Sequence, residues 1–354
     1  MSATEKTLKI LKLLTEAFGP AGFEDEVREI IKTQIKPFVD QMETDDLGNL
    51  ITFRQGTDPK GAVLMIDAHM DEIGLMITTI DSQGFLRFVT IGGWDPRILP
   101  AQILKIRTKD GTYRTGVIGA NPPHIVRDRS KPFDLHELFI DVGASSKKEA
   151  EEMGFKPGCP AVIPREFHRL SENRILGKAL DDRSGCAILI KVLEMLSKSN
   201  HEATIAANFA VQEEVGGRGA TVAAFRIKPN AALALEGTVG ANTPGVPEHL
   251  MPTATGRGPA ITIMDNSLIA NPKLVALLEQ ISDQEKIPVQ YRKPIGGGTD
   301  AGRIHIVRTG IPAAVVSTPC RYIHSPISIL DLRDFNQAVK LVTTFSQRVH
   351  EIFK

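Results

Sequence analysis

The sequence ATIAANFAVQEEVGG fills residues 203–217 and joins an apolar run to two adjacent glutamates and a pair of glycines. The run from Ala203 to Val211 predicts a buried β-strand, because it is short, continuous and apolar. Neighbouring side chains of a strand point to opposite faces, but the chain turns where a strand ends. Glu213 and Glu214 can therefore both reach the same crevice at the end of this strand.

Outward from this stretch, predicted strands alternate with predicted helices. Further strands are expected at 62–68, 231–235 and 312–317, and helices at 182–196, 271–286 and 330–353. This alternation predicts an α/β fold in which a mixed sheet is sandwiched by helices. Ligands of such sheets bind at the carboxyl ends of the strands, where the acidic residues fall.

The pattern changes between about residues 73 and 164. This part consists of short β-like runs rich in turn residues, and only Lys147–Met153 has helical character. We therefore expect a catalytic domain made of residues 1–71 and 165–354. An inserted, mostly β domain would occupy residues 72–164.

Composition excludes several classes of protein. Of the 354 residues, 42 are Lys or Arg and 42 are Asp or Glu, so no basic excess indicates a nucleic-acid partner. No apolar run approaches membrane-spanning length, and the polar start lacks a signal peptide. The three scattered cysteines, Cys159, Cys186 and Cys320, form no Cys-x-x-Cys pair. A cytoplasmic protein without a membrane or nucleic-acid partner is expected.

Histidine and carboxylate residues follow several other predicted elements. His69 and Asp71 come after the strand at 62–68, and Asp181 precedes a helix. Glu236 ends the strand at 231–235, and His324 lies in a loop. In a functional interpretation His69 binds a metal through one ring nitrogen, and Asp71 accepts from the other nitrogen and fixes the tautomer.

Each of these residues also has an ordinary structural explanation. A strand end often carries His and Asp, a helix start favours acids such as Asp181, and paired glutamates can form a solvated turn. A lone His324 in a loop is more often structural. The whole constellation nevertheless favours a pair of divalent metal ions, since two histidines and several carboxylates suit such ions. The residues alone thus indicate a dinuclear metallohydrolase.

The motifs that carry these residues resemble those of the tetrahedral-aminopeptidase family, and the resemblance runs the full length of the chain. The family includes glutamyl and deblocking aminopeptidases and proteins once labelled endoglucanases. The matching stretches are AHMDEIG at 68–74, KALDDRSG at 178–185, QEEVG at 212–216, GTDAG at 298–302 and RYIHSP at 321–326.

The resemblance implies a zinc-exopeptidase-like catalytic domain and an inserted dimerisation domain, with dimers that assemble into a homo-oligomeric dodecamer. It also assigns a set of metal ligands in which Asp181 bridges two divalent ions per subunit, zinc first and cobalt second: His69, Asp181, Glu214, Glu236 and His324. Some family members carry Asp where this chain has Glu236. Glu213 would be the general base that takes a proton from the attacking water, and Asp71 would orient His69. The implied substrates are peptides, from which an N-terminal amino acid is released.

Two alternatives remain at this point. A glycoside hydrolase could use Glu213 with Glu236 or Asp71, although 5% aromatic residues and a single Trp offer few platforms for sugar stacking. A peptide-binding assembly protein without catalytic activity is the other alternative.

The preferred N-terminal residue does not follow from the sequence. An acidic preference would need a basic pocket, for which Arg257, Arg292 and Arg321 are candidates. Ordinary surface or capping roles are favoured for Arg257 and Arg292. The glycine-rich stretch 296–302 lacks the phosphate-binding spacings, and we interpret it as a loop lining the substrate pocket.

Overall fold

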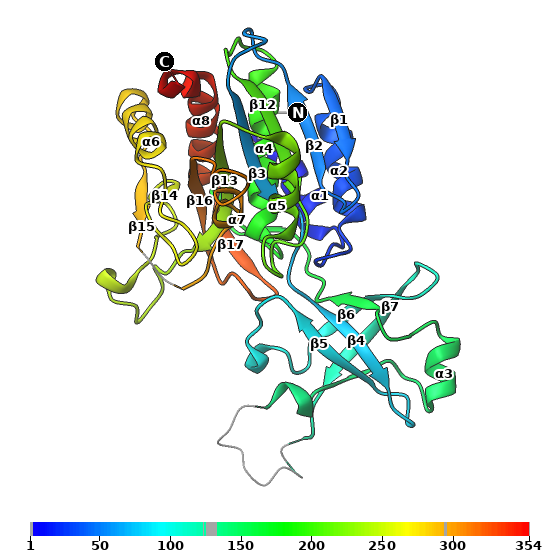
Figure 1. Cartoon of the computed structure of the whole chain (residues 1–354). Helices are drawn as coiled ribbons and strands as arrows, with labels where there is room; N and C mark the ends of the chain where they lie inside the picture. Colours follow the sequence, from blue (N-terminus) through cyan, green and yellow to red (C-terminus); the bar gives the residue numbers. More distant parts are fainter. Residues whose placement is uncertain (1–2, 123, 125–132, 294–295, 354) are drawn as a thin grey trace.

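The computed structural model describes residues 3–122, 124, 133–293 and 296–353. Two sheets organise the chain, and they lie in separate parts of the molecule (Figure 1). The strands of the larger sheet are β1 (Gln41–Thr44), β2 (Leu50–Arg54), β3 (Val63–His69), β10 (His168–Arg169), β11 (Arg174–Gly177), β12 (Thr204–Ala210), β13 (Ala231–Val239), β14 (Ala260–Thr262), β15 (Gln290–Arg292), β16 (Ala313–Arg321) and β17 (Ser328–Asp331).

The larger sheet is mixed. Its order is β1-β2-β12-β3-β13-β16-β17-β11-β10, and β14 pairs with both β15 and β16. The neighbours β12, β3, β13 and β16 run parallel, whereas β2 and β17 pair antiparallel with the strands beside them. Every residue of β12 is buried, as expected for a central strand covered on both faces. The predicted mixed α/β fold is therefore confirmed.

Helices cover both faces of the larger sheet. α1, α2, α4 and α8 pack together on one face, and α5 and α7 contact β12, β13 and β3 from the other face (Figure 1). The helices are α1 (Ala3–Glu16), α2 (Asp25–Ile35), α4 (Leu180–Leu196), α5 (Arg218–Ile227), α6 (Pro272–Glu285), α7 (Asp300–Ile304) and α8 (Leu332–Arg348), with short 3₁₀ turns η3 (Glu248–Leu250) and η4 (Val349–Phe353). α8 buries Phe335, Ala338, Val342 and Phe345 at helical spacing, which fastens it to the sheet.

The smaller sheet is a closed antiparallel barrel in the order β4-β5-β8-β7-β6-β9. Its elements are β4 (Gly74–Ile80), β5 (Leu86–Ile91), β6 (Ile103–Arg107), β7 (Tyr113–Gly119), β8 (Phe139–Asp141) and β9 (Pro160–Val162), with α3 (Lys147–Glu152), η1 (Pro96–Ile98) and η2 (Leu135–Glu137). The barrel has its own apolar core, which includes Leu75, Leu86 and Ile106. Burial alternates along most of β5, because one face of the strand points into this core.

Several predicted elements differ from the structure in length. The strands expected to end at 235 and 317 continue to Val239 and Arg321, because β13 and β16 pair in register over this extension. The stretch 296–302, interpreted as a loop, enters helix α7 at Asp300. Within the described ranges, no helix combines the length and apolarity needed to cross a membrane.

Candidate active site

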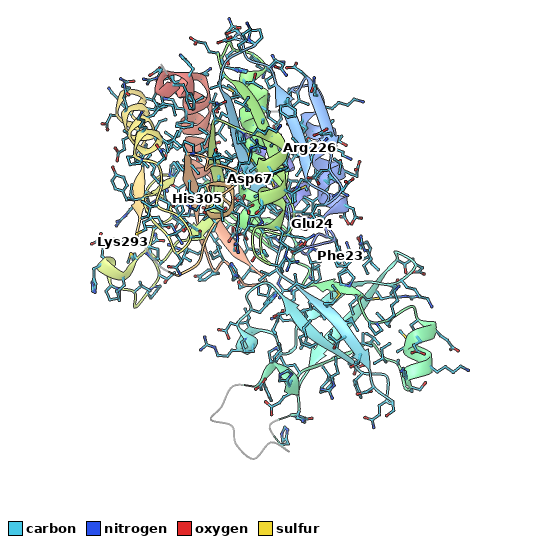
Figure 2. The ribbon with its side chains drawn as sticks, in the orientation of Figure 1. Phe23, Glu24, Asp67, Arg226, Lys293 and His305 are labelled. Atoms are coloured by element: carbon cyan, nitrogen blue, oxygen red, sulfur yellow. The ribbon has the colours of Figure 1, made fainter. Side chains whose placement is uncertain are left out.

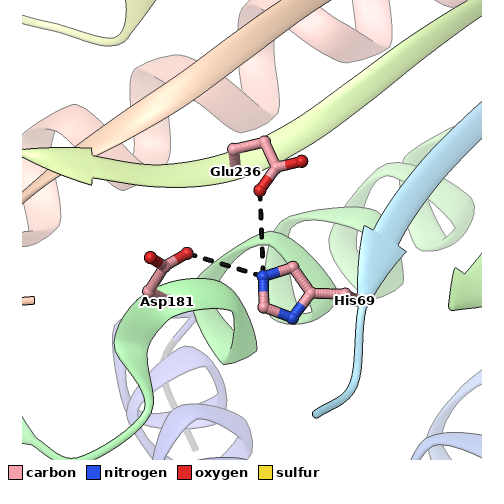
Figure 3. A group of neighbouring side chains, drawn as sticks. All are labelled: His69, Asp181 and Glu236. Atoms are coloured by element: carbon pink, nitrogen blue, oxygen red, sulfur yellow. Dashed lines mark ion pairs between the residues drawn. The ribbon is translucent and has the colours of Figure 1, made fainter. Parts of the chain in front are cut away.

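His69 is the last residue of β3, and its side chain is 2% exposed. Its Nδ1 lies 3.2 Å from the backbone oxygen of Asp71 and 3.5 Å from its Oδ1. Its Nε2 lies 3.6 Å from Asp181 Oδ1 and 3.8 Å from Glu236 Oε2 (Figure 3). The same nitrogen lies 3.9 Å from Glu213 Oε2. Burial alone lowers the pKa of His69, but the nearby carboxylates of Asp181 and Asp71 outweigh it and raise the pKa.

The adjacent glutamates lie in the turn that follows β12. The turn opens at Gln212, which has a φ of 58°. The backbone N–H of Glu213 donates to Asp71 Oδ1 at 2.9 Å, and that of Glu214 donates to Oδ2 at 3.0 Å. Asp71 thus holds the backbone of both glutamates as well as facing His69. Sequence reasoning missed this second contact, because 142 residues separate Asp71 from Glu213.

Asp181 lies at the start of α4, where the backbone is extended rather than helical, and its peptide bond with Asp182 is cis. Its Oδ1 faces His69 and accepts from the backbone N–H of Gly237 at 3.1 Å. Its Oδ2 lies 3.9 Å from Nε2 of His324. One carboxylate therefore stands between the two histidines.

Glu236 lies inside β13, so the expectation that it ends its strand was wrong. The strand continues because residues 236–239 pair with 317–320 of β16. Glu236 nevertheless faces the site, and its Oε1 accepts from the backbone N–H of Asp300 at 2.9 Å. Asp300 begins α7 and lies in the glycine-rich stretch 296–302. The first residue of this helix therefore helps to position the Glu236 carboxylate.

His324 belongs to the turn between β16 and β17 and has a φ of 54°. Its Nε2 lies 3.8 Å from Glu214 Oε2, and its Nδ1 lies 3.0 Å from the backbone oxygen of Gly93. Gly93 follows β5 of the barrel. A carbonyl from the inserted part of the chain thus contacts a histidine of the larger sheet.

The described residues contain two overlapping sets of three metal-type donors. His69, Asp181 and Glu236 form one set, and Asp181, Glu214 and His324 form the other. Within each set one ligand atom per residue lies within 4.8 Å of the others. Imidazole and carboxylate donors suit zinc and similar divalent ions, and the shared Asp181 has one oxygen toward each set. The donors present fit a pair of divalent ions.

Burial and mutual repulsion disfavour the charged forms of most carboxyl groups in the site. Burial raises the pKa of Glu213 to about 7, and burial together with the charge of Asp181 raises the pKa of Glu214 well above its usual range. Burial and the charge of Glu213 do the same for Glu236. Asp181 is the exception, because contacts with His69 outweigh burial and lower its pKa. Bound cations would relieve the repulsion among these groups.

Sequence reasoning missed a buried polar group beside the site. Asp67 of β3 and Asn208 of β12 are fully buried, and Asn208 Nδ2 donates to Asp67 Oδ1 at 2.5 Å. Burial raises the pKa of Asp67 to about 6, although the hydrogen bond from Asn208 opposes the shift. Asp67 lies in the centre of the larger sheet (Figure 2). A polar residue inside each of two apolar strands was the signal that could have revealed this group.

The site opens into a cavity of about 950 Å³. Its lining includes the glycines at 216–217 and 296–298, so backbone forms part of the wall. The prediction that 296–302 lines the pocket is therefore confirmed for Gly296–Gly298, Thr299 and Gly302.

The three arginine candidates have different surroundings. Arg257 is exposed and pairs with Glu248 at 3.2 Å, as expected for a surface residue. Arg321 donates to the backbone oxygen of Asn242 at 2.8 Å. Arg292 is 8% exposed and lines the cavity, so the surface or capping role favoured for it was wrong. Its position in β15, next to the glycine-rich segment, brings it there.

Comparison with known proteins gives consistent matches over nearly the whole chain. The model of the M42 glutamyl aminopeptidase family matches residues 48–341. A lysyl aminopeptidase from Pyrococcus furiosus is 38% identical over 338 residues, which are 94% of this chain and 94% of the relative. A glutamyl aminopeptidase from Lactococcus lactis is 31% identical over 333 residues, which are 93% of this chain and 92% of the relative.

Solved structures share the fold. An aminopeptidase from Desulfurococcus kamchatkensis has a TM-score of 0.94 and 42% identity, covering 98% of this chain and 96% of its own. A TET aminopeptidase from a marine-sediment Thaumarchaeota archaeon has a TM-score of 0.95 and 37% identity, with both chains fully covered. The TET1 peptidase of Pyrococcus horikoshii, which can assemble into a tetrahedron or a large octahedral shell, has a TM-score of 0.86 and 34% identity over 96% of this chain and 99% of that one.

Proposed function

This chain belongs to the M42 glutamyl aminopeptidase family and is an aminopeptidase, and from that premise we propose how its residues release the N-terminal amino acid of a peptide. Family membership favours this reaction over the glycoside hydrolase and the binding-protein alternatives. The observation that carries the proposal is the pair of donor sets that share Asp181, with Glu213 beside them.

We propose that two divalent ions bind at these donor sets, zinc first and cobalt second. His69, Asp181 and Glu236 would hold one ion, and Asp181, Glu214 and His324 would hold the other, with Asp181 shared. When bound, such ions acidify a water molecule and polarise the scissile carbonyl.

Glu213 is the proposed general base. Its side chain is 19% exposed, lines the cavity and lies 3.9 Å from His69 Nε2. A pKa of about 7, raised chiefly by burial, suits proton transfer near neutral pH. Glu213 would take a proton from the attacking water and deliver it to the leaving amine nitrogen as the C–N bond breaks. Asp71 would keep this carboxylate in place through its hydrogen bond with the Glu213 backbone.

The free α-amino group of the substrate explains why cleavage stops at the first residue. An ammonium or amine group placed beside the proposed metal centre would meet carboxylates that line the cavity, including Glu213 and Glu236. A peptide bond far from an N-terminus lacks that anchor. The same carboxylates would therefore set both the chemistry and the position of cleavage.

We also propose that residues 1–71 and 165–354 form the catalytic domain and that the insertion at 72–164 is a dimerisation domain. Exposed apolar side chains on the barrel support an interface, namely Val89, Ile103 and Val117. The assembly of the Pyrococcus horikoshii relative supports a homo-oligomer built from such dimers, with a dodecamer as the expected size. Light scattering of the purified protein tests this size.

Hydrolysis of aminoacyl-p-nitroanilides tests the reaction. Activity should vanish with a chelator and return with zinc or cobalt. Glu213→Gln should retain the bound metal while kcat falls by about 10²- to 10⁴-fold, the usual contribution of a general base. Glu172→Gln, at an exposed position, is the matched control. Full activity of Glu213→Gln would contradict its role as the general base. Full activity of the metal-free protein would contradict a role of divalent ions in the reaction.

A further inference from the structure

Arg292, the last residue of β15, is a buried cation without a counter-ion among the described residues. Its Nε donates to Thr238 Oγ1 at 3.2 Å, and its Nη1 is buried and has no hydrogen-bond partner in the described part of the chain. No carboxylate of the described residues pairs with it. The guanidinium nevertheless lines the cavity of the site. Since burying an unpaired charge is costly, this arrangement calls for an anionic ligand.

Arg292 lies close to the proposed metal ligands. Thr238, which accepts its hydrogen bond, is two residues after Glu236 on β13. Residues two apart on a strand project from the same face and are about 7 Å apart. A substrate residue anchored at Glu236 through its amino group would therefore have its side chain within reach of the Arg292 guanidinium.

The cavity is lined by ionisable side chains of both signs. Its carboxylates, Asp181 and the glutamates at 213, 214 and 236, all belong to the proposed metal centre. The ionisable side chains among the described lining residues that are not part of that centre are Arg292, Arg303 and His305, the last of which follows α7 (Figure 2). The two arginines should attract a carboxylate and repel an ammonium group.

We infer that Arg292 binds the side-chain carboxylate of the N-terminal residue and makes the enzyme selective for acidic N-terminal residues, glutamate before aspartate. This inference rests on the proposed function. Family membership does not decide the preference, because the relatives include both a lysyl and a glutamyl aminopeptidase. A guanidinium pairs with a carboxylate through two parallel hydrogen bonds, and the guanidinium of Arg292, a residue that lines the cavity, donates only to Thr238 among the described residues. The glutamyl side chain is one methylene longer than the aspartyl side chain, so it reaches further from an anchored amino group toward Arg292.

The test compares p-nitroanilides of glutamate, glutamine, aspartate, leucine and lysine on the metal-loaded, full-length protein. For the wild type, kcat/KM should be at least roughly 30-fold higher for the glutamyl than for the glutaminyl substrate, as expected for a desolvated charge pair. Arg292→Gln should bring this ratio close to one while the leucyl substrate is cleaved about as fast as before. Arg257→Gln is the matched control, and its ratio should equal that of the wild type.

Each outcome separates this inference from the proposed function. Loss of all metal-dependent hydrolysis in the wild type would sink the proposed function itself. If the wild type cleaves the leucyl or lysyl substrate faster than the glutamyl substrate, only the acidic preference is overturned. This comparison uses the wild type alone, so it does not depend on whether a variant folds. A ratio unchanged in Arg292→Gln but lowered in Arg303→Gln would move the role to Arg303 and overturn the assignment.

A second source of the carboxylate must be distinguished, namely the C-terminus of a short peptide. Leu-Ala and its C-terminal amide serve as probes on the wild type and on Arg292→Gln. Under the proposal, the variant treats the two probes as the wild type does. If the variant instead loses only a preference for the free acid over the amide, Arg292 binds the peptide C-terminus and the proposal fails.

Discussion

Asp71 and Glu72 are neighbours in the chain, yet they enter two buried clusters with opposite electrostatics. Glu72 Oε1 accepts from Lys178 Nζ at 2.5 Å and lies 3.3 Å from Arg183 Nη2, so the chain itself neutralises this carboxylate. Both cations also donate to backbone oxygens, Lys178 to that of Ala17 at 2.7 Å. Asp71 instead joins the carboxylates around His69, where acids outnumber the cations of the chain.

The difference separates a structural cluster from a functional one. Burial of charged groups is common to both clusters. Only the cluster around His69 lacks internal neutralisation, and this deficit is what divalent ions would supply. The structural cluster should therefore determine stability, and the other cluster should determine activity.

The largest expected effect comes from removing the carboxylate that both donor sets share. Asp181→Asn should lower kcat/KM by at least about 10³-fold and reduce metal content, because both ions lose a ligand. The metal-free variant should melt at a somewhat lower temperature than the metal-free wild type at neutral pH, because the lowered pKa of Asp181 means that contacts with His69 favour its charged form. Kinetics, elemental analysis and thermal unfolding in chelator measure the three quantities. If Asp181→Asn failed to fold, Asp181 would be needed for stability, and the contrast between the cluster around Glu72 and the cluster around His69 would not hold.

The counterpart in the neutralised cluster is Lys178→Met. Glu72 would keep Arg183 alone, and breaking a buried ion cluster should lower the free energy of unfolding by about 3–5 kcal/mol. The folded fraction should retain a near-normal kcat. Urea unfolding with parallel kinetics measures both quantities. Lys148→Met is the matched control, because Lys148 and its partner Glu152 are exposed, and it should cost less than about 1 kcal/mol. Equal effects of the two variants would contradict the structural role.

Glu24 gives a pH-dependent prediction, since it is buried beside Asp71. Burial, reinforced by the charge of Asp71, raises the pKa of Glu24 to about 7. The stabilising protonated form is fully present below the unfolded pKa of 4.5 and is lost as pH rises through 7. Glu24→Gln should therefore stabilise the protein at pH 8, by at most about 3 kcal/mol, and leave it little changed at pH 4.5. Chemical unfolding of metal-free protein across this range tests the sign; a gain at low pH only would refute it.

The smallest effect is expected from Asp71→Asn. An amide oxygen can still accept one of the two backbone hydrogen bonds from Glu213 and Glu214, but the other bond and the charge toward His69 are lost. Residues that orient metal ligands typically contribute 10- to 100-fold, so kcat/KM or metal affinity should fall by about that factor. Glu72→Gln is the control next to it in the chain. Glu72→Gln should lower the free energy of unfolding and leave turnover unchanged. If Glu72→Gln instead lowered turnover and Asp71→Asn lowered only stability, the roles assigned to the two acids would be wrong.

Local patterns in the sequence predicted the mixed sheet, because strands and helices alternate with clear apolar runs. They also predicted His69 and Asp181 as site residues, since both stand at the edges of such elements. The contacts that complete the site join residues far apart in the chain, for example Asp71 with Glu213 and Arg292 with Thr238. No local periodicity encodes such pairings. The burial of Arg292 was misjudged for the same reason, because it depends on the packing of β15 against the cavity.

The contact between His324 and the carbonyl of Gly93 has a consequence for protein engineering. The barrel cannot be exchanged independently of the larger sheet, because Gly93 in the loop after β5 contacts His324 and helps to orient it. A chimera that exchanged only the barrel strands between relatives would have to transplant this loop together with its partner turn. A minimal version that joined Asp71 directly to Arg165 could keep the larger sheet, yet it would lose the fixed imidazole.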